Sequence, residues 1–401
     1  MLVVGSPPPS GTDLDLLVRP REEQMVRAGL RDAGFLEGGR RFARFGLGCG
    51  FEIELLAGED WALPRSEIEA LFAEATPLPG LNRLVEPAPH HQLLILATKL
   101  VGSGDLLSDR RKARIDRALA EDPNAWQRAG ERLAAWGDRT ALNRLQVARQ
   151  AQRPGPKTRA RLRPGQLRQA VCGRRGLVVA LSGIDGSGKS LQARALQTAL
   201  GDIGIASEVE WIPLAHNRWI ERIRRALKRV LARFATFQPT RNEPSAAERG
   251  LRPTPSSILR ERSSILTYCW VTMVALANGS SHARRIALNR MRGRVIIFDR
   301  YVLDSIARLR FFYGDDQAFG LPRAVIQLLS PRPTAAFFLD VPAEVSAARK
   351  DDGWHIDELG QQVRLYREEQ ARLGVAVRLD GERPEADLAA EIAASVWREL
   401  R

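Results

Sequence analysis

The segment from Gly183 to Ser190 carries the most specific chemistry in the sequence. It reads Gly-Ile-Asp-Gly-Ser-Gly-Lys-Ser, the pattern G-x-x-x-x-G-K-S, in which the glycines let backbone N–H groups point at phosphate oxygens. Lys189 can place its charge on the β- and γ-phosphates of a nucleotide, and Ser190 can offer a hydroxyl to Mg²⁺. The pattern predicts a phosphate-binding loop made of Gly183, Ile184, Asp185, Gly186, Ser187, Gly188, Lys189 and Ser190.

The residues on either side of this loop form the context that it requires. An apolar run precedes it at 177–182, and the helix-like sequence LQARALQTAL follows it. A helix that begins at the loop presents its positive N-terminal end to a bound anion. This context favours a nucleotide site over the alternative, an ordinary glycine-rich turn.

A second chemical element is the apolar strand pattern at 295–299, which ends in Asp299 and is followed by Arg300. An acid at the end of such a strand can hold Mg²⁺ or its waters beside the phosphate loop. An arginine next to it can hold a phosphate, since ligands of open α/β sheets bind at the carboxyl ends of the strands. The alternative is a structural pair between Arg300 and a neighbouring acid.

These residues need a scaffold, and the pattern downstream of residue 176 predicts an α/β fold. Strand patterns at 177–182, 207–212, 295–299 and 335–341 alternate with helical patterns, of which the last runs from Glu385 to Leu400. Such alternation is typical of a parallel sheet with helices on both faces. A basic Pro/Arg-rich stretch predicts the boundary, so we divide the chain into a first domain at 1–150, a linker at 151–175 and a second domain at 176–401.

Both motifs resemble those of the thymidylate kinase family. GIDGSGKSLQ (183–192) and FDRYVLDSIA (298–307) are similar to the family's acid-containing P-loop and its D-R-Y segment. Softer likenesses are PRPTAAFFLDVPAEVSAARK (331–350), similar to the strand and LID entrance, and 378–400, similar to the closing strand and helix. The resemblance covers about 176–401 and implies a P-loop nucleoside-monophosphate-kinase-like domain that uses ATP and Mg²⁺.

The resemblance also implies roles for single residues. Lys189 and Ser190 would serve the ATP phosphates and Mg²⁺, with Asp299 near the metal. Asp185 matches the P-loop acid, and Arg300 would hold the acceptor phosphate.

Ser187 stands where some members of the family place a P-loop arginine, so this chain resembles the subclass whose LID supplies that charge. Arg349 is then the expected LID arginine, with Lys350 second, and an arginine on a closing lid would neutralise charge in phosphoryl transfer.

The acceptor side departs from the family pattern. WIPLAHNRW follows the strand at 207–212 where the family has an R-E-P-G segment. The segment from Asp304 to Leu309, DSIARL, stands where the family has S-S-x-A-Y-Q, so Arg308 and Leu309 replace its tyrosine and the glutamine that reads the thymine edge. An insertion at about 214–262 interrupts a region that is compact in the family. Kinase chemistry is therefore better supported than the identity of the acceptor.

The first domain carries a cluster of acidic positions near its start. Gly5-Ser6 precedes Asp13 and Asp15 in TDLDLLV, and Glu52 and Glu54 follow in FEIEL. Alternate residues of a strand share a face, so Asp13, Asp15 and Glu54 could hold a divalent metal, with Glu52 as the substitute for Glu54. Gly-Ser followed by D-x-D resembles the nucleotidyltransferase superfold, which implies an α+β nucleotidyltransferase-like domain. Solvated surface acids, or an inherited fold without activity, are the alternatives.

His90 and His91 stand at the start of a helical pattern, APHHQLLILATKL. Adjacent residues of a helix point to different faces. We therefore interpret the pair as a helix start and not as metal ligands.

Composition limits the compartment and the partners. The 401 residues exceed one ordinary core, and the three cysteines, at no metal-like spacing, predict neither a disulfide framework nor a zinc site. The start has no signal-peptide pattern, and the longest apolar stretch, Ile265 to Ala277, is too short for a membrane span and predicts a buried helix. We expect a cytoplasmic protein.

The formal net charge of +14 gathers at 152–176 and 218–234, a linker and an amphipathic helix pattern. Solvated basic surface is the simpler interpretation; contact with nucleic acid or acidic lipid is the alternative.

The leading hypothesis is a nucleotidyltransferase-like domain fused to a thymidylate kinase-like enzyme of nucleotide biosynthesis, with a nucleotide as substrate. A kinase of the same fold with another phosphorylated or hydroxyl acceptor is the second hypothesis. The third is a nucleic-acid-associated P-loop ATPase, whose binding would weaken steeply with salt. The sequence leaves the oligomeric state open, with a homodimer among the options.

Overall fold

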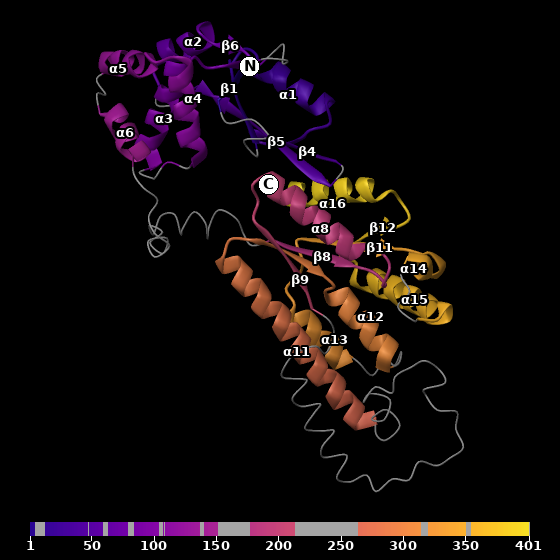
Figure 1. Ribbon diagram of the computed structural model, residues 1–401. Coiled ribbons are helices and arrows are strands. Elements are labelled where there is room, and N and C mark those ends of the chain that lie inside the picture. The colour runs from indigo at the N-terminus through magenta and orange to yellow at the C-terminus, as the bar shows by residue number, and fades with distance from the viewer. Residues whose placement is uncertain are drawn as a thin grey trace. The chain divides into compact units, whose positions relative to one another are not determined.

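The computed structural model divides the chain into two compact units, which we describe separately. The first unit holds the elements from β1 to α6, and the second holds those from β8 onward (Figure 1). The structure describes residues 1–4, 13–46, 48–58, 63–78, 84–103, 107, 109–136, 140–150, 177–212, 264–313, 320–349 and 354–400.

The first unit contains a mixed sheet with the strand order β3-β4-β5-β2-β1-β7-β6. Its strands are β1 (Leu2–Val3), β2 (Asp13–Val18), β3 (Leu36–Gly38), β4 (Arg41–Gly46), β5 (Cys49–Ala57), β6 (Thr76–Pro77) and β7 (Val85–Glu86). Strands β2 and β5 pair in parallel, and β1 is antiparallel to β2. Leu16, Val18 and Ile53 belong to one core cluster and Leu17 to another, because alternate residues of a strand point to opposite faces.

Helices complete the first unit. They are α1 (Glu23–Asp32), α2 (Arg65–Ala73), α3 (Pro89–Ser103), α4 (Asp109–Glu121), α5 (Ala125–Ala135) and α6 (Ala141–Gln150). Leu93, Ile115 and Leu133 are buried together, so α3, α4 and α5 share one apolar core. This packing fixes the start of α3 against the rest of the unit.

The second unit contains a five-stranded sheet in the order β12-β11-β8-β10-β9, and all of its pairings are parallel. Its strands are β8 (Val178–Ser182), β9 (Ser207–Trp211), β10 (Val295–Asp299), β11 (Ala335–Asp340) and β12 (Val377–Asp380). Its helices are α8 (Lys189–Asp202), α11 (Ser264–Met291), α12 (Val302–Tyr313), α13 (Gly320–Leu329), α14 (Ala343–Arg349), α15 (Ile356–Leu373) and α16 (Glu385–Glu399).

Helices cover both faces of this sheet. In Figure 1, α8 and α16 lie on one side of it, and α12 and α15 lie on the other. All residues of β8 and β10 are buried, as their continuous apolar sequences require in a sheet without a solvent face. Phe338 of β11 packs with Leu303 of α12 and Tyr366 of α15, which ties these helices to the middle of the sheet.

The sequence predicted this architecture well. The parallel sheet is confirmed, and the strand expected at 295–299 and the helix expected from Glu385 agree with β10 and α16 to within a residue. The apolar stretch from Ile265 is part of α11, in which Val271 and Val274 are fully buried. Within the described part of the chain, helices are either too short or too polar to cross a membrane.

Several expectations lie outside the described residues. They are the linker at 151–175, the insertion at 214–262, the basic segments at 152–176 and 218–234, Gly5-Ser6, and Lys350. The domain boundaries drawn at residues 150 and 175 therefore stay predictions.

Candidate functional site

The loop between β8 and α8 has the backbone shape that phosphate binding requires. Gly186 and Gly188 have φ angles of 80° and 87°, in the left-handed region that only glycine enters at little cost. A Cβ at Gly186 would lie 2.7 Å from the carbonyl oxygen of Ser346, so the close approach of α14 also requires glycine. Positive φ angles at Gly186 and Gly188 are compatible with a loop that turns backbone N–H groups toward a bound phosphate at the start of α8.

Lys189 is the first residue of α8, and its side chain folds back over this loop. Its Nζ donates a hydrogen bond to the carbonyl oxygen of Ile184 at 2.9 Å and lies 3.6 Å from Asp185 Oδ1. Burial lowers the pKa of Lys189, and the positive charge of Arg300 lowers it further. An anion bound in the loop would offset this cost, because it would restore an opposite charge beside the ammonium.

Ser190 and Asp299 form an oxygen pair at the carboxyl edge of the sheet. The Ser190 hydroxyl donates to Asp299 Oδ2 at 2.5 Å, although the residues are 109 positions apart in the sequence. Asp299 Oδ1 is buried and has no hydrogen-bond partner in the described part of the molecule. Oxygen ligands of this kind are what Mg²⁺ prefers, so the pair fits the predicted metal position.

Arg300 is held in a strained backbone conformation. Its φ is 88°, and it is the one non-glycine residue with positive φ in the described ranges. Such a conformation costs about 1–3 kcal/mol and persists where the surroundings demand it. Here the Arg300 N–H donates to the Leu181 carbonyl oxygen at 3.0 Å, and the guanidinium Nη2 donates to Asp185. This backbone conformation, at the end of β10, allows the Arg300 side chain to reach Asp185 in the loop.

The Arg300 guanidinium is only partly satisfied. Its Nε and Nη1 are buried without a hydrogen-bond partner among the described residues. Burial alone would lower the pKa of Arg300, but Tyr366, Asp185, Asp304 and Asp299 outweigh it and raise the pKa. The charge is therefore permanent, and two donors are free to receive an oxyanion.

Sequence reasoning assigned no role to three further residues of this site, Asp304 and Arg308 of α12 and Tyr366 of α15. Arg308 Nη2 donates to Asp185 Oδ2 at 2.8 Å, so one carboxylate carries two arginines. Asp304 accepts hydrogen bonds from the Tyr301 N–H at 3.1 Å and from the Tyr366 hydroxyl at 3.0 Å. The departure from the family pattern at Asp304 and Arg308 was the available signal, but only packing shows that these side chains turn toward the loop.

Two expected residues lie elsewhere. The Arg349 side chain, at the end of α14, donates to the Gly381 carbonyl oxygen at 2.9 Å. Leu309 is 3% exposed and packs with Trp270 and Ile326 in the core. In this arrangement Arg349 does not join the site, and its role as a LID residue stays a prediction.

The acidic positions of the first unit are neighbours. The parallel register pairs Asp13 with Glu52 and Asp15 with Glu54. Arg41 approaches both glutamates, with distances of 3.3 Å from its Nη1 to Glu52 and 3.6 Å from its Nε to Glu54. The strand prediction is confirmed, and an arginine supplies positive charge at these glutamates.

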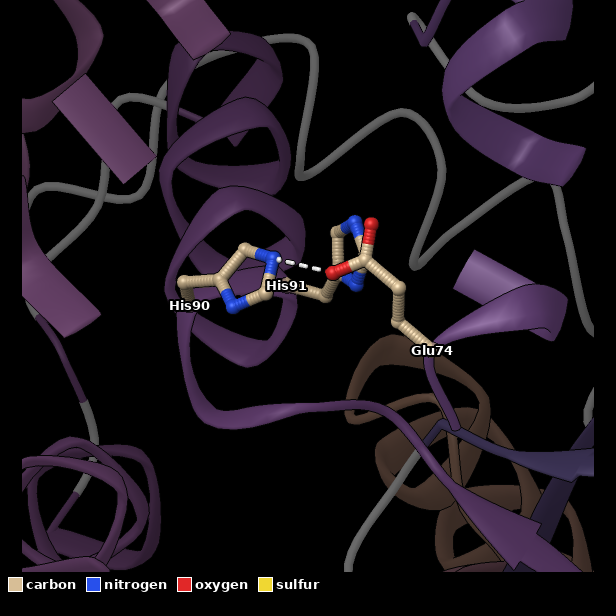
Figure 2. A group of neighbouring side chains, drawn as sticks. All are labelled: Glu74, His90 and His91. Carbon is tan, nitrogen blue, oxygen red and sulfur yellow. Dashed lines mark ion pairs between the residues drawn. The ribbon is translucent and has the colours of Figure 1, made fainter. Parts of the chain in front are cut away.

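The prediction that His90 and His91 point to different faces is wrong. Their ring centroids are only 4.2 Å apart, and both rings lie beside the carboxylate of Glu74 (Figure 2). The histidines do begin helix α3, as expected. His90 Nε2 lies 3.1 Å from Glu74 Oε2, and His91 Nε2 lies 2.9 Å from Glu67 Oε1, so contacts with acids in and just after α2 orient both rings.

A comparison with known proteins finds a similarity to a thymidylate kinase. The chain is 27% identical over 195 residues to a probable thymidylate kinase of Pyrococcus abyssi (strain GE5 / Orsay), which covers 48% of this chain and 78% of that protein. No family model matches the chain. The similarity supports a thymidylate kinase-like region and a kinase-like phosphoryl transfer. It gives no support to the expected nucleotidyltransferase-like domain.

Proposed function

We propose that the second unit transfers the γ-phosphoryl group of ATP to a nucleoside monophosphate, with thymidine monophosphate as the default acceptor. The observation that carries the proposal is the convergence of Lys189, Ser190, Asp299 and Arg300 at the carboxyl ends of β8 and β10. Ligands of open parallel sheets bind at this edge. The similarity to a probable thymidylate kinase supports the same reaction class.

The donor side follows from the loop. Its N–H groups and Lys189 hold the β- and γ-phosphates, and the Ser190 hydroxyl and the Asp299 carboxylate hold Mg²⁺. Mg²⁺, when bound, neutralises charge on the phosphate oxygens. The hydrogen bond between Ser190 and Asp299 keeps both oxygens at one place, so little rearrangement is needed to bind the ion.

The acceptor side follows from Arg300. Two of its buried guanidinium nitrogens are unpartnered, which costs about 1–3 kcal/mol for each group and is offset when a phosphate accepts hydrogen bonds from them. Asp185 holds Arg300 in position from the loop. We propose that Arg300 binds the acceptor phosphate and keeps it beside the donor.

Arg308 favours a second candidate, a kinase of the same fold that takes a different phosphorylated acceptor. Leu309, the residue after Arg308, is buried in the core. This chain therefore has no side chain at position 309 that could read a base as the family's glutamine does. A second guanidinium on Asp185, with a side chain 19% exposed, can bind further negative charge on the acceptor. Arg308→Ala would then raise the acceptor KM and leave the ATP KM unchanged.

The deciding experiment is ATP consumption screened against a panel of nucleoside monophosphates. Turnover that depends on one monophosphate and is lost in Lys189→Ala supports the proposal. ATP consumption that no monophosphate stimulates would refute it.

For the first unit we propose divalent-metal binding by Asp13, Asp15 and Glu54, in line with the nucleotidyltransferase resemblance. The support is the register that makes the acidic positions of β2 and β5 neighbours. Binding would require the metal to compete with Arg41 for Glu54.

A further inference from the structure

The first unit contains a compact group of nitrogen and oxygen ligands apart from its acidic strand positions. Glu74 follows the end of α2, and His90 and His91 lie in the first turn of α3. One ligand atom from each of the three residues lies within 4.8 Å of the others. Figure 2 shows the carboxylate beside both imidazole rings. We propose that Glu74, His90 and His91 bind a zinc ion.

The contacts of His91 leave one of its nitrogens ready for a metal. Its Nε2 lies 2.9 Å from Glu67 Oε1, and Arg132 Nη1 donates to the other oxygen of Glu67 at 3.1 Å. Burial raises the pKa of Glu67, and the ion pair with Arg132 opposes this shift. With Glu67 as the carboxylate partner of Arg132, the ring N–H that it accepts is on Nε2. The lone pair is then on Nδ1, which is buried and has no hydrogen-bond partner within the described ranges.

This arrangement is the one that metal-binding histidines use. A zinc-bound imidazole commonly donates its other N–H to a carboxylate, which fixes the tautomer and the ring orientation. Glu67 makes that contact with His91, and Arg132 orients Glu67 and also bonds Glu74. Both the ligand set and the groups that orient it are therefore present.

The burial and the charge of the group also suit a metal. His90 and His91 are 3% and 0% exposed. Two carboxylates, Glu67 and Glu74, face one guanidinium, Arg132, and the excess negative charge favours a cation.

The ligand types select zinc over magnesium. Mg²⁺ prefers an octahedron of oxygens, whereas two imidazoles and a carboxylate are a common zinc set that leaves one position for water. His90 Nε2 lies 3.1 Å from Glu74 Oε2. Ligand atoms of a tetrahedral zinc ion lie roughly 3.3 Å apart when the bonds are about 2.0–2.1 Å. The pair therefore needs little movement to share one ion, which would connect the end of α2 to the start of α3.

The test titrates Zn²⁺ into the full-length protein after chelator treatment, with its cysteines blocked, in competition with a chromophoric chelator. One equivalent of Zn²⁺ should bind. Glu74→Gln should weaken binding at least about tenfold, and His90→Gln should do so as well. Glu69→Gln, which changes an exposed glutamate of the same helix, and His355→Gln in the other unit should bind as the unchanged protein does.

Glu74→Gln is the decisive variant because the Glu74 side chain is 39% exposed and its loss should not prevent folding. Zn²⁺ should raise the Tm of the unchanged protein and not that of Glu74→Gln. Substitution by Co²⁺ should give a tetrahedral visible spectrum without thiolate bands. Absence of stoichiometric binding at micromolar Zn²⁺, or equal affinity in Glu74→Gln, would overturn the proposal.

Discussion

Replacement of Lys189 by alanine separates the charge of the phosphate loop from its shape. Lys189 is 4% exposed, and its ammonium contacts the Ile184 carbonyl oxygen and Asp185. Alanine is a good helix former, so α8 should still begin at this position. Burial lowers the pKa of Lys189, because the buried ammonium loses its contact with water. Replacement of this side chain by alanine should therefore leave the protein folded.

The size of the expected loss follows from electrostatics. The ammonium forms an ion pair with Asp185 Oδ1 at 3.6 Å, and we take a separation of about 4 Å for its interaction with a bound phosphate. Two unit charges about 4 Å apart interact by about 4 kcal/mol at an effective dielectric constant near 20. With about 1.4 kcal/mol for each factor of ten, Lys189→Ala should lower kcat/KM for ATP by roughly a thousandfold.

The assay is steady-state phosphoryl transfer with the best acceptor of the monophosphate panel, accompanied by the Tm of each variant. Arg194→Ala is the matched control, because it removes an exposed basic residue from the same helix. Activity of Lys189→Ala within about tenfold of the unchanged protein, with Arg194→Ala normal, would refute the assignment of the loop as the donor site.

Four further predictions test other parts of the molecule. Arg300→Ala should raise the acceptor KM far more than the ATP KM, because we propose that its two buried, unpartnered nitrogens bind the acceptor phosphate. A loss confined to ATP would place Arg300 on the donor side. Thymidine monophosphate, the default acceptor, should be turned over less efficiently than by an ordinary thymidylate kinase, because Leu309 is buried where the family reads the base. Efficient, thymidine-selective turnover in steady-state kinetics with thymidine, uridine and cytidine monophosphates would contradict this. Burial lowers the pKa of His91 to about 3, so the unfolded state takes up a proton at a higher pH than the folded state. The free energy of unfolding should therefore fall as pH decreases from about 7 to 5, by at most about 1.4 kcal/mol for each pH unit. In urea unfolding, the free energy of unfolding of His91→Gln should depend less on pH. Mn²⁺ binding without nucleotide should weaken in Asp13→Asn/Asp15→Asn; no binding at millimolar Mn²⁺ in the unchanged protein would make the first unit a scaffold.

The turn at Gly183–Ser190 and the strands around it could be predicted because their signals are local, whereas phosphate binding by this turn stays a proposal. Glycines at 186 and 188 are needed wherever the backbone takes a positive φ, whatever packs around them. The strand at 295–299 is apolar up to its last residue, Asp299, because both faces of its sheet are covered, and its length is visible in the sequence. The same reasoning identified α8 and α16.

Contacts between residues that are far apart in the sequence could not be predicted from local patterns. Arg308 joins Asp185 across 123 positions, and Tyr366 joins Asp304 across 62. These pairs depend on how α12 and α15 rotate as their apolar faces pack on β11, and many rotations are compatible with one hydrophobic pattern. The sequence showed that Arg308 departs from the family pattern, but not where its side chain lies.

The first unit shows the same division. Alternation of acidic and apolar residues predicted β2 and β5, whereas their pairing register, and the approach of Arg41 to both glutamates, came from the sheet. The prediction that His90 and His91 point to different faces used helix geometry alone. It did not include the contacts that both rings make with acids in and just after α2. By itself the sequence determined which backbone segments form and which one can surround a phosphate, because these depend on residues close together in the chain. Only the tertiary structure decided which charged and ligating side chains meet, because burial and helix packing orient them.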